Sequence, residues 1–311
     1  MNSSGDLPGF FAKVEVGARV LQDGWVGVFY LPSPCSKHQA IVSDCILDYL
    51  KLADSKDLRW TIDEDGDAVE LTADEIERKL EALGRPNGTS VGFRLGDNPA
   101  GVSGFRVRYI GVHPSDPMVV GLQDAVSLLL LTYPTEAVEA IGLDAIVQFH
   151  DSVAGRLPLS TGYTSPAFLF APGAGEPAAF EVIRRLSSRY RCIDIPYVSI
   201  ECFELGRKVK GAYWLNYLGA DAVSALGGAE AIENALSGKG VKLRALPGDL
   251  TAIQVDAPPS AGDSNRRDDL SAYMVIAEAI KPLQYRPSVS FPEFELEETI
   301  EWFQRFAPPP D

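Results

Sequence analysis

The order of apolar and polar residues predicts a strand near the start of the chain and a helix behind it. Residues 25–31 are nearly all apolar, and such a run indicates a strand that is buried on both faces. After Pro32 and Pro34, Ser36 and Gln39 have the spacing of a capping box, so we expect a helix to begin at Ser36. This helix carries apolar residues at helical spacing, namely Val42, Cys45, Ile46, Tyr49 and Leu52.

A second capping box, Thr72 with Glu75, predicts a shorter helix that ends at Gly84 in the left-handed conformation. Between the two helices, residues 63–67 read Asp-Glu-Asp-Gly-Asp, which is typical of a turn between two short strands. The position where a calcium loop needs its final glutamate is Asp74, so we expect a solvated acidic hairpin and no metal there.

The next two segments alternate with a period of two. Between residues 91 and 96, and again between 105 and 109, apolar residues alternate with glycine or arginine. This period is typical of half-exposed antiparallel strands, and the Asn98–Pro99 turn between them predicts a hairpin. Arg94, Arg106 and Arg108 occupy the polar positions of the two strands.

The rest of the chain repeats an order of strand, proline and helix, with proline at positions 134, 172 and 258. The helix after Pro134 is expected to continue through Val153. Together these elements favour an α+β fold: a mixed, largely antiparallel sheet, or two related sheets, with helices packed mainly on one face. We expect a single domain over residues 21–306, with 21–125 and 126–285 as candidate similar halves. Residues 1–20 are expected to be flexible and 307–311 disordered.

Charge narrows the classes of partner. The chain of 311 residues carries 28 basic and 43 acidic side chains, a net charge of −15, which disfavours nucleic acid and anionic membranes as partners. Most of the excess lies in two segments: residues 54–81 have four basic and eleven acidic residues, and residues 293–311 have one and six. No secretory signal and no apolar run of membrane-spanning length is present, so we expect a cytoplasmic protein.

Candidate chemistry is sparse. The three histidines lack the spacing of a metal site, and we expect surface or capping roles for them. The four cysteines are expected to be reduced core residues, and no cofactor or metal is predicted. Gly262-Asp263-Ser264 is similar to the Gly-Asp-Ser of some esterases, although no histidine follows it in the chain. A small-substrate hydrolase that uses this turn therefore remains an alternative.

Several short motifs in the second half resemble the bacterial type VI secretion immunity family, formerly a domain of unknown function. The stretch 210–218 (Lys-Gly-Ala-Tyr-Trp-Leu-Asn-Tyr-Leu) is followed by a pair of glycines, by a Gly-Asp-Ser-Asn-Arg turn and by a tyrosine. One departure is Ala212–Tyr213, where relatives often have a small apolar residue and Asn. The residues that carry the resemblance, for which structural roles are expected, are Gly211, Trp214, Gly227, Gly228, Gly262, Asp263, Asn265, Arg266 and Tyr273.

The resemblance implies a non-enzymatic immunity protein that binds and neutralises a cognate secreted toxin, and so protects the producing cell and its siblings. Some such toxins are nucleases, which are basic because they hold phosphate. The other alternative is a non-catalytic adaptor of the secretion machinery. The residues that we expect to face the toxin are Asp63, Glu64, Asp65, Asp67, Glu297, Glu298, Glu301, Trp302 and Phe306. Among them, Trp302 and Phe306 are expected to be exposed aromatic anchors, because Leu296, Ile300, Phe303 and Ala307 form an apolar stripe of their own.

Overall fold

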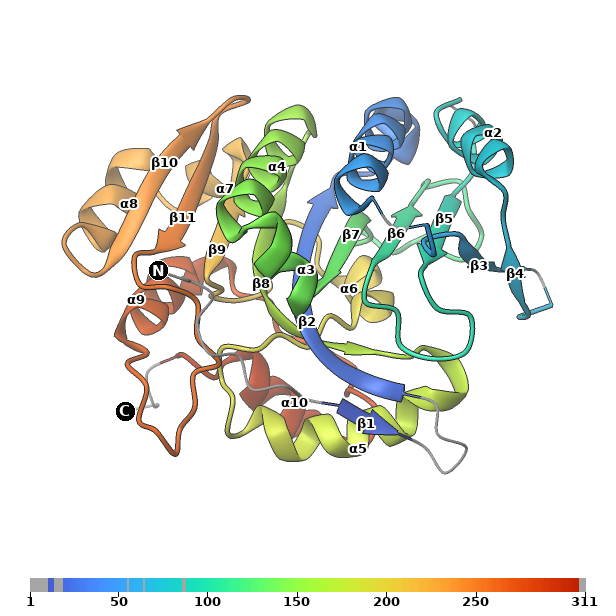
Figure 1. Ribbon diagram of the computed structural model, residues 1–311. Helices are drawn as coiled ribbons and strands as arrows, with labels where there is room; N and C mark the ends of the chain where they lie inside the picture. The colour runs from blue at the N-terminus through green and yellow to red at the C-terminus, as the bar shows by residue number, and fades with distance from the viewer. Residues whose placement is uncertain (1–10, 14–18, 55, 64, 86–87, 308–311) are drawn as a thin grey trace.

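All the strands join one sheet. The computed structural model describes residues 11–13, 19–54, 56–63, 65–85 and 88–307. Their strands form an 11-stranded sheet in the order β10-β11-β9-β8-β2-β7-β6-β5-β3-β4, with β1 paired to β2 outside this path (Figure 1). The strands are β1 (Phe11–Lys13), β2 (Arg19–Leu31), β3 (Trp60–Ile62), β4 (Ala68–Glu70), β5 (Val91–Gly96), β6 (Arg106–Gly111), β7 (Ser127–Pro134), β8 (Thr161–Phe170), β9 (Leu215–Leu218), β10 (Val241–Leu246) and β11 (Leu250–Val255).

Helices cover both faces of this sheet, and most of them lie on one face, as the sequence predicts. The first face packs against α1 (Gln39–Ala53), α2 (Ala73–Leu83), α3 (Thr135–Ile141), α4 (Leu143–Arg156), α7 (Ala220–Ala225), α8 (Ala229–Leu236) and α9 (Ser271–Ile280). The second face packs against α5 (Glu176–Ser187), α6 (Val198–Glu204) and α10 (Leu296–Phe303). The α+β class is confirmed, and so is the largely antiparallel sheet, since the ladders between the named strands are antiparallel.

The long strand β2 lies at the centre of the sheet, between β7 and β8. Its residues alternate between the two cores: Trp25 and Phe29 pack in the first, Val28 and Tyr30 in the second. The prediction that residues 25–31 are buried on both faces is therefore confirmed. Three short 3₁₀ helices complete the described structure, η1 (Cys35–Lys37), η2 (Gly173–Gly175) and η3 (Lys281–Leu283).

The predicted helix start is confirmed for α2 and is wrong for α1. Thr72 and Glu75 form the expected capping box at the start of α2. Gly84 ends that helix, but its φ of −67° is right-handed, not left-handed. The expected start at Ser36 is wrong, because residues 35–37 form η1 and α1 begins only at Gln39, without a side-chain cap.

One expected helix is split. The helix predicted after Pro134 forms as α3 and α4, and Gly142 between them has a φ of +92°, outside the range of a right-handed helix.

The domain boundaries remain a prediction. Segments 21–125 and 126–285 share the same sheet, because β2 of the first lies between β7 and β8 of the second. Within the segment expected to be flexible, residues 11–13 form β1 and β2 begins at Arg19; residues 1–10 and 14–18, like 308–311 of the predicted tail, lie outside the described residues. No helix in the described part of the chain is long and apolar enough to cross a membrane.

Candidate functional site

The predicted acidic hairpin forms from β3 and β4, at the outer end of the sheet (Figure 1). Asp63 holds its turn, because one oxygen of its carboxylate accepts the backbone N–H groups of Asp65 at 3.0 Å and Asp67 at 2.8 Å. Gly66 completes the turn with a φ of +91°, which favours glycine. Asp63 therefore shapes the hairpin, while the residues it holds present their side chains to solvent.

Asp63, Asp65 and Asp67 are all exposed, and Glu64 lies outside the described residues. Among the described residues, neither Asp65 nor Asp67 has a basic side chain within ion-pair distance. The tip is therefore a concentration of uncompensated negative charge.

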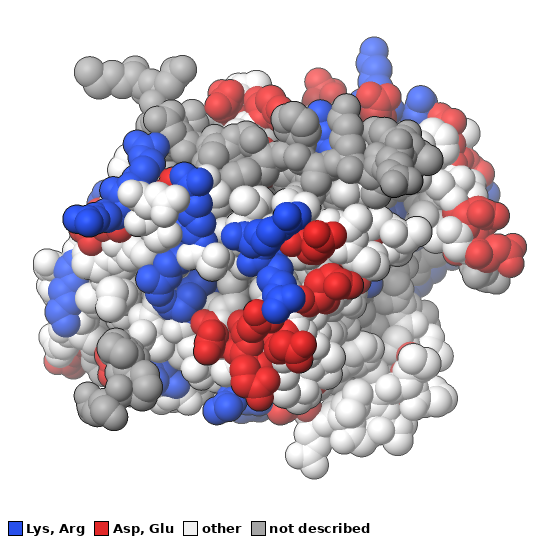
Figure 2. All heavy atoms as spheres, turned by 90° about the horizontal axis from the view of Figure 1, so that it is seen from below, with Lys and Arg blue, Asp and Glu red and all other residues white. Residues whose placement is uncertain are grey.

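The acidic residues of α10 have a different environment. Glu298 accepts hydrogen bonds from Arg184 at 2.7 and 3.1 Å, and this contact holds the pKa of the Glu298 carboxyl below its usual value. Glu297 and Glu301 are exposed on the same helix. Figure 2 shows that acidic and basic side chains lie next to one another on this lower face of the molecule. The negative charge of α10 is thus partly neutralised within the protein.

The expected exposure of Trp302 and Phe306 is wrong. Trp302 is 5% exposed and Phe306 is 3% exposed. The guanidinium of Arg305 lies 4.0 Å from the centre of the Trp302 ring, and Phe306 stacks on Tyr273 with ring centres 5.0 Å apart. Trp302 lies in α10 and Phe306 in the turn after it, and both side chains pack in the core, so neither is available as a surface anchor.

The reason is the phase of the helix. The buried residues of α10 are Thr299, Trp302 and Phe303, and Phe306 is buried in the turn that follows the helix. The stripe that the sequence favoured shares only Phe303 with this buried side. Leu296 and Ile300 of the favoured stripe are only half-buried. Tertiary packing decides which side is buried: Trp302 and Phe303 pack in the core with α5 and residues 291–294, and Phe306 packs on Tyr273 of α9.

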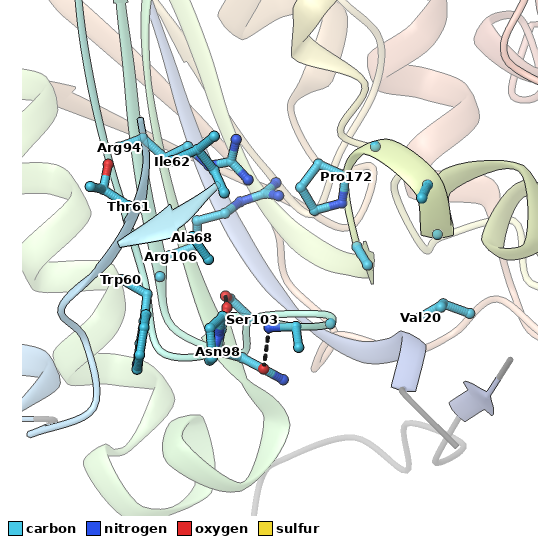
Figure 3. A pocket seen from close by; sticks show the side chains of 18 of the residues that line it. Val20, Trp60, Thr61, Ile62, Ala68, Arg94, Asn98, Ser103, Arg106 and Pro172 are labelled. Carbon is cyan, nitrogen blue, oxygen red and sulfur yellow. Dashed lines mark hydrogen bonds between the residues drawn. The ribbon is translucent and has the colours of Figure 1, made fainter. Parts of the chain in front are cut away.

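A feature that the sequence did not assign is a pocket beside the acidic hairpin, which we call the arginine pocket (Figure 3). It has a volume of about 490 Å³ and lies between β3, β5, the loop after β5 and the segment after β8. Its polar lining includes Thr61, Arg94, Asn98, Ser103 and Arg106. An adjoining pocket of about 560 Å³ shares Thr61, Ile62 and Arg94 with it and adds Arg108.

Strand register places the three arginines on one face. Arg94 of β5 and Arg108 of β6 are paired directly across the ladder, and Arg106 is two residues along β6. Figure 3 shows the guanidinium groups of Arg94 and Arg106 extending in the same direction, toward Pro172. Arg108 donates a hydrogen bond to Ser199 at 3.1 Å.

Arg106 is buried and forms no ion pair within the described residues, although the more distant carboxylate of Glu176 acts to raise its pKa. The residue is only 8% exposed, and its Nε has no hydrogen-bond partner among the described residues. Burial, together with the neighbouring charges of Arg108 and Arg94, lowers the pKa of Arg106 to about 9. Among the described residues that line the arginine pocket there is no aspartate or glutamate. The sequence predicts half-exposed strand positions for these arginines. Their shared face, in an otherwise acidic chain, was the feature from which a basic pocket could have been predicted.

A second group of charges is enclosed in the protein. The ammonium of Lys210 lies 3.1 Å from Asp194 and 2.8 Å from Glu201, and all three side chains are at most 2% exposed. Tyr163 and Tyr213 donate hydrogen bonds to Asp194 at 2.6 and 2.9 Å. The neighbouring cavity has no room for a water-sized molecule, so this cluster is a structural network with no space for a substrate.

The Gly-Asp-Ser turn has a structural arrangement. Asp263 accepts two hydrogen bonds from Arg189, at 2.9 and 2.7 Å, and the contact lowers the Asp263 pKa to about 2. Ser264 is exposed, and its backbone N–H donates to Arg189. The imidazoles of the chain bond elsewhere or not at all: His150 with Tyr133 and Thr164, His113 with Ser115. None of these hydrogen bonds joins a histidine to this serine, as a Ser–His pair would require.

The remaining motif residues lie in turns and in the core. Trp214 is buried and donates from Nε1 to the carbonyl of Ala257 at 3.0 Å. Gly227 and Gly228, between α7 and α8, have φ angles of +93° and +92°. Gly211 and Gly262 are buried, Asn265 and Arg266 belong to the exposed turn after Asp263, and Tyr273 lies in α9.

Two of the three histidines and all four cysteines are buried. The expectation of surface or capping roles fails for His150, which is fully buried; His38 is also buried and occupies the N-cap position of α1, but its side chain makes no capping hydrogen bond. The four cysteines are free and buried, as predicted. Within the described residues, no three His, Cys, Asp or Glu side chains are grouped closely enough to hold a metal ion.

Comparisons with known proteins agree with the motifs. Residues 41–306 match the TsiV family model, described as type VI immunity for VRR-NUC. A similar solved structure is the Pseudomonas aeruginosa T6SS protein PA0821, with a TM-score of 0.76 and 17% identity over 97% of this chain and 89% of that chain; at this identity the likeness shows the fold alone. A search of curated proteins gave no match. Because the family model spans most of the chain, the protein belongs to the type VI immunity family and is an immunity protein against a type VI effector toxin.

Proposed function

We propose that this immunity protein neutralises a nuclease effector of the VRR-NUC type in the cytoplasm, by binding it through the acidic β3–β4 hairpin and without catalysis. The description of its family supports such a nuclease as the partner. A nuclease has to hold phosphate, so we expect it to present a basic surface. The observation that carries the proposal is the exposed, uncompensated pair Asp65 and Asp67 at the outer end of the sheet.

The hairpin is a better docking surface than α10. The carboxylate of Glu298 already binds Arg184 and also caps its own helix through the backbone of Glu295. The aromatic residues that would have anchored a partner on α10 are buried. In contrast, the exposed carboxylates of the hairpin are free to attract a basic partner and to raise the association rate.

The test compares two double variants with the same change in net charge, Asp65→Lys/Asp67→Lys on the hairpin and Glu297→Lys/Glu301→Lys on α10. Asp63 is left in place because it holds the turn. We expect the hairpin variant to slow association with the nuclease by about tenfold at low ionic strength, since steering by clustered charge raises association rates by factors of this order and more. Rates are measured by surface plasmon resonance at several salt concentrations.

The α10 variant is the matched control, because it changes the total charge equally at a different place. If both variants slow association to the same extent, the effect comes from net charge and the hairpin is not the docking surface. If the unmodified chain does not bind the nuclease or prevent its toxicity in cells, the proposed partner itself is wrong.

A further inference from the structure

The arginine pocket is unusual because no carboxylate lies among the described residues that line it. The protein has 43 acidic side chains, yet Arg94 and Arg106 face the pocket without an ion pair among the described residues. Burial of an unpaired charge costs free energy, which a partner of opposite charge can recover. A buried guanidinium with an unbonded Nε is therefore a site prepared for an acceptor.

The lining indicates the chemistry of that acceptor. Two guanidinium groups offer several N–H donors in planar forks, a geometry that matches the two oxygens of a carboxylate or the oxygens of a phosphate. Thr61, Asn98 and Ser103 add neutral polar groups around them. A volume of about 490 Å³ is large enough to admit a side chain that enters from outside.

The surroundings distinguish between the sources of such an oxyanion. The acidic hairpin contributes Ile62, Gly66 and Ala68 to the wall of the pocket, so Asp63, Asp65 and Asp67 flank it directly in sequence. Their charge, with the net charge of −15, repels a free anion or a nucleic acid that approaches from solution. A protein that meets the hairpin with basic residues overcomes this repulsion and can place an acidic residue of its own next to them.

We propose that the arginine pocket receives the carboxylate of an aspartate or glutamate side chain of the toxin, held by Arg94 and Arg106. This inference rests on the proposed function, since it assumes that the toxin docks at the hairpin. The two features then have separate tasks. The hairpin steers a basic surface toward the protein, and the arginine pocket fixes the register of the complex through a buried, charge-assisted contact.

The test uses Arg106→Gln and Arg94→Gln in the full chain, with Arg207→Gln as the matched control. Arg207 is an exposed arginine, paired with Asp221 at 3.4 Å, and its replacement changes the net charge by the same amount. We expect each pocket variant to raise the Kd for the toxin about thirtyfold or more, mainly through faster dissociation, because one partner of a buried charge pair is lost. Arg207→Gln should leave both rates within about twofold.

A measurement of stability distinguishes a variant that weakens binding from one that fails to fold. Because Arg106 is buried with an unbonded Nε and has no ion pair in the part of the chain that the structure describes, Arg106→Gln should leave the melting temperature of the free protein unchanged or raise it. Arg94 is less buried than Arg106, so Arg94→Gln provides a second variant that tests the pocket even if Arg106→Gln disturbs folding. A double-mutant cycle against Asp→Asn and Glu→Gln variants of the toxin should find one carboxylate whose loss weakens binding to the unmodified chain but not to Arg106→Gln.

Inorganic phosphate, titrated into the free protein at constant ionic strength by calorimetry, tests the other source. Micromolar phosphate binding that both pocket variants abolish, with toxin affinity unchanged, would identify a site for a small anion and overturn the inference. Unchanged toxin affinity without phosphate binding would overturn it as well. In either case the proposed function stands as long as the unmodified chain binds the toxin and the hairpin variant slows association more than the α10 variant, so the two failures are distinguishable.

Discussion

Replacement of Lys210 by Met should destabilise the protein strongly, because it leaves two carboxylates unpaired in the core. The ammonium contacts Asp194 at 3.1 Å and Glu201 at 2.8 Å, and it also donates to the hydroxyl of Tyr163 at 2.9 Å and to a backbone carbonyl at 3.0 Å. Removing one partner of a buried ion pair costs about 3–5 kcal/mol. We therefore expect a loss of about this size in the free energy of unfolding at pH 7.

The control lies two residues away in the sequence. Lys208 also pairs with a carboxylate, that of Asp124 at 3.3 Å, but both side chains are substantially exposed. An exposed pair is worth about 1 kcal/mol or less, so Lys208→Met should cost no more than that. Both variants are measured by urea denaturation, followed by tryptophan fluorescence and circular dichroism.

The pH dependence of the difference tests the cause. Burial already raises the pKa of Glu201, and loss of the ammonium should raise it further. A carboxyl whose pKa is higher in the folded state than in the unfolded state binds a proton first in the folded state, which stabilises the folded protein as the pH falls toward the unfolded pKa. The cost of Lys210→Met should therefore shrink between pH 7 and about 4.5. A cost equal to that of Lys208→Met, or one independent of pH, would refute the reasoning.

Two other predictions concern the buried histidines. A Cβ at Gly27 would lie 2.4 Å from Cε1 of His150, so Gly27→Ala should lower the free energy of unfolding in urea by about 1–3 kcal/mol. Gly92→Ala is the control, because the atom nearest to its Cβ would be 3.9 Å away. Equal costs for the two variants would contradict the clash. Burial lowers the pKa of His38 to about 4 and that of His150 to about 3, so the unfolded state binds more protons below pH 6.5. The two together should remove about 3 kcal/mol of stability between pH 7.5 and 5.5, and NMR should show both rings neutral at pH 5.5; protonated rings there would exclude this cause.

Parts of the fold could be predicted because their signals are local. The apolar run in β2 and the capping box of α2 each depend on residues a few positions apart. The helix period of α10 was also evident, but its buried face was not, since two stripes of apolar residues satisfy the same period. Only the neighbours in the folded protein decide which side is turned inward, and they place Trp302 in one core and Phe306, in the turn after the helix, in the other.

The candidate site divides in the same way. The acidic hairpin followed from a run of adjacent residues, so its position and exposure were predictable from the sequence. The arginine pocket was not, although the alternation of Arg106 and Arg108 along one strand was visible. An alternating strand shows which residues share a face, but whether that face is covered, open or hollow depends on elements elsewhere in the chain.

The sequence by itself predicted several of the strands and helices, the two acidic segments and the family of this protein, because each depends on short-range spacing and composition. The tertiary structure alone decided which charges remain uncompensated. Lys210 meets its carboxylates from residues 194 and 201 in a closed core, while Arg94 and Arg106 meet none in the pocket that lies between β3, β5 and the segment after β8. The physical reason is that the energy of a buried charge depends on its distance to other charges and to water, and chain folding sets both.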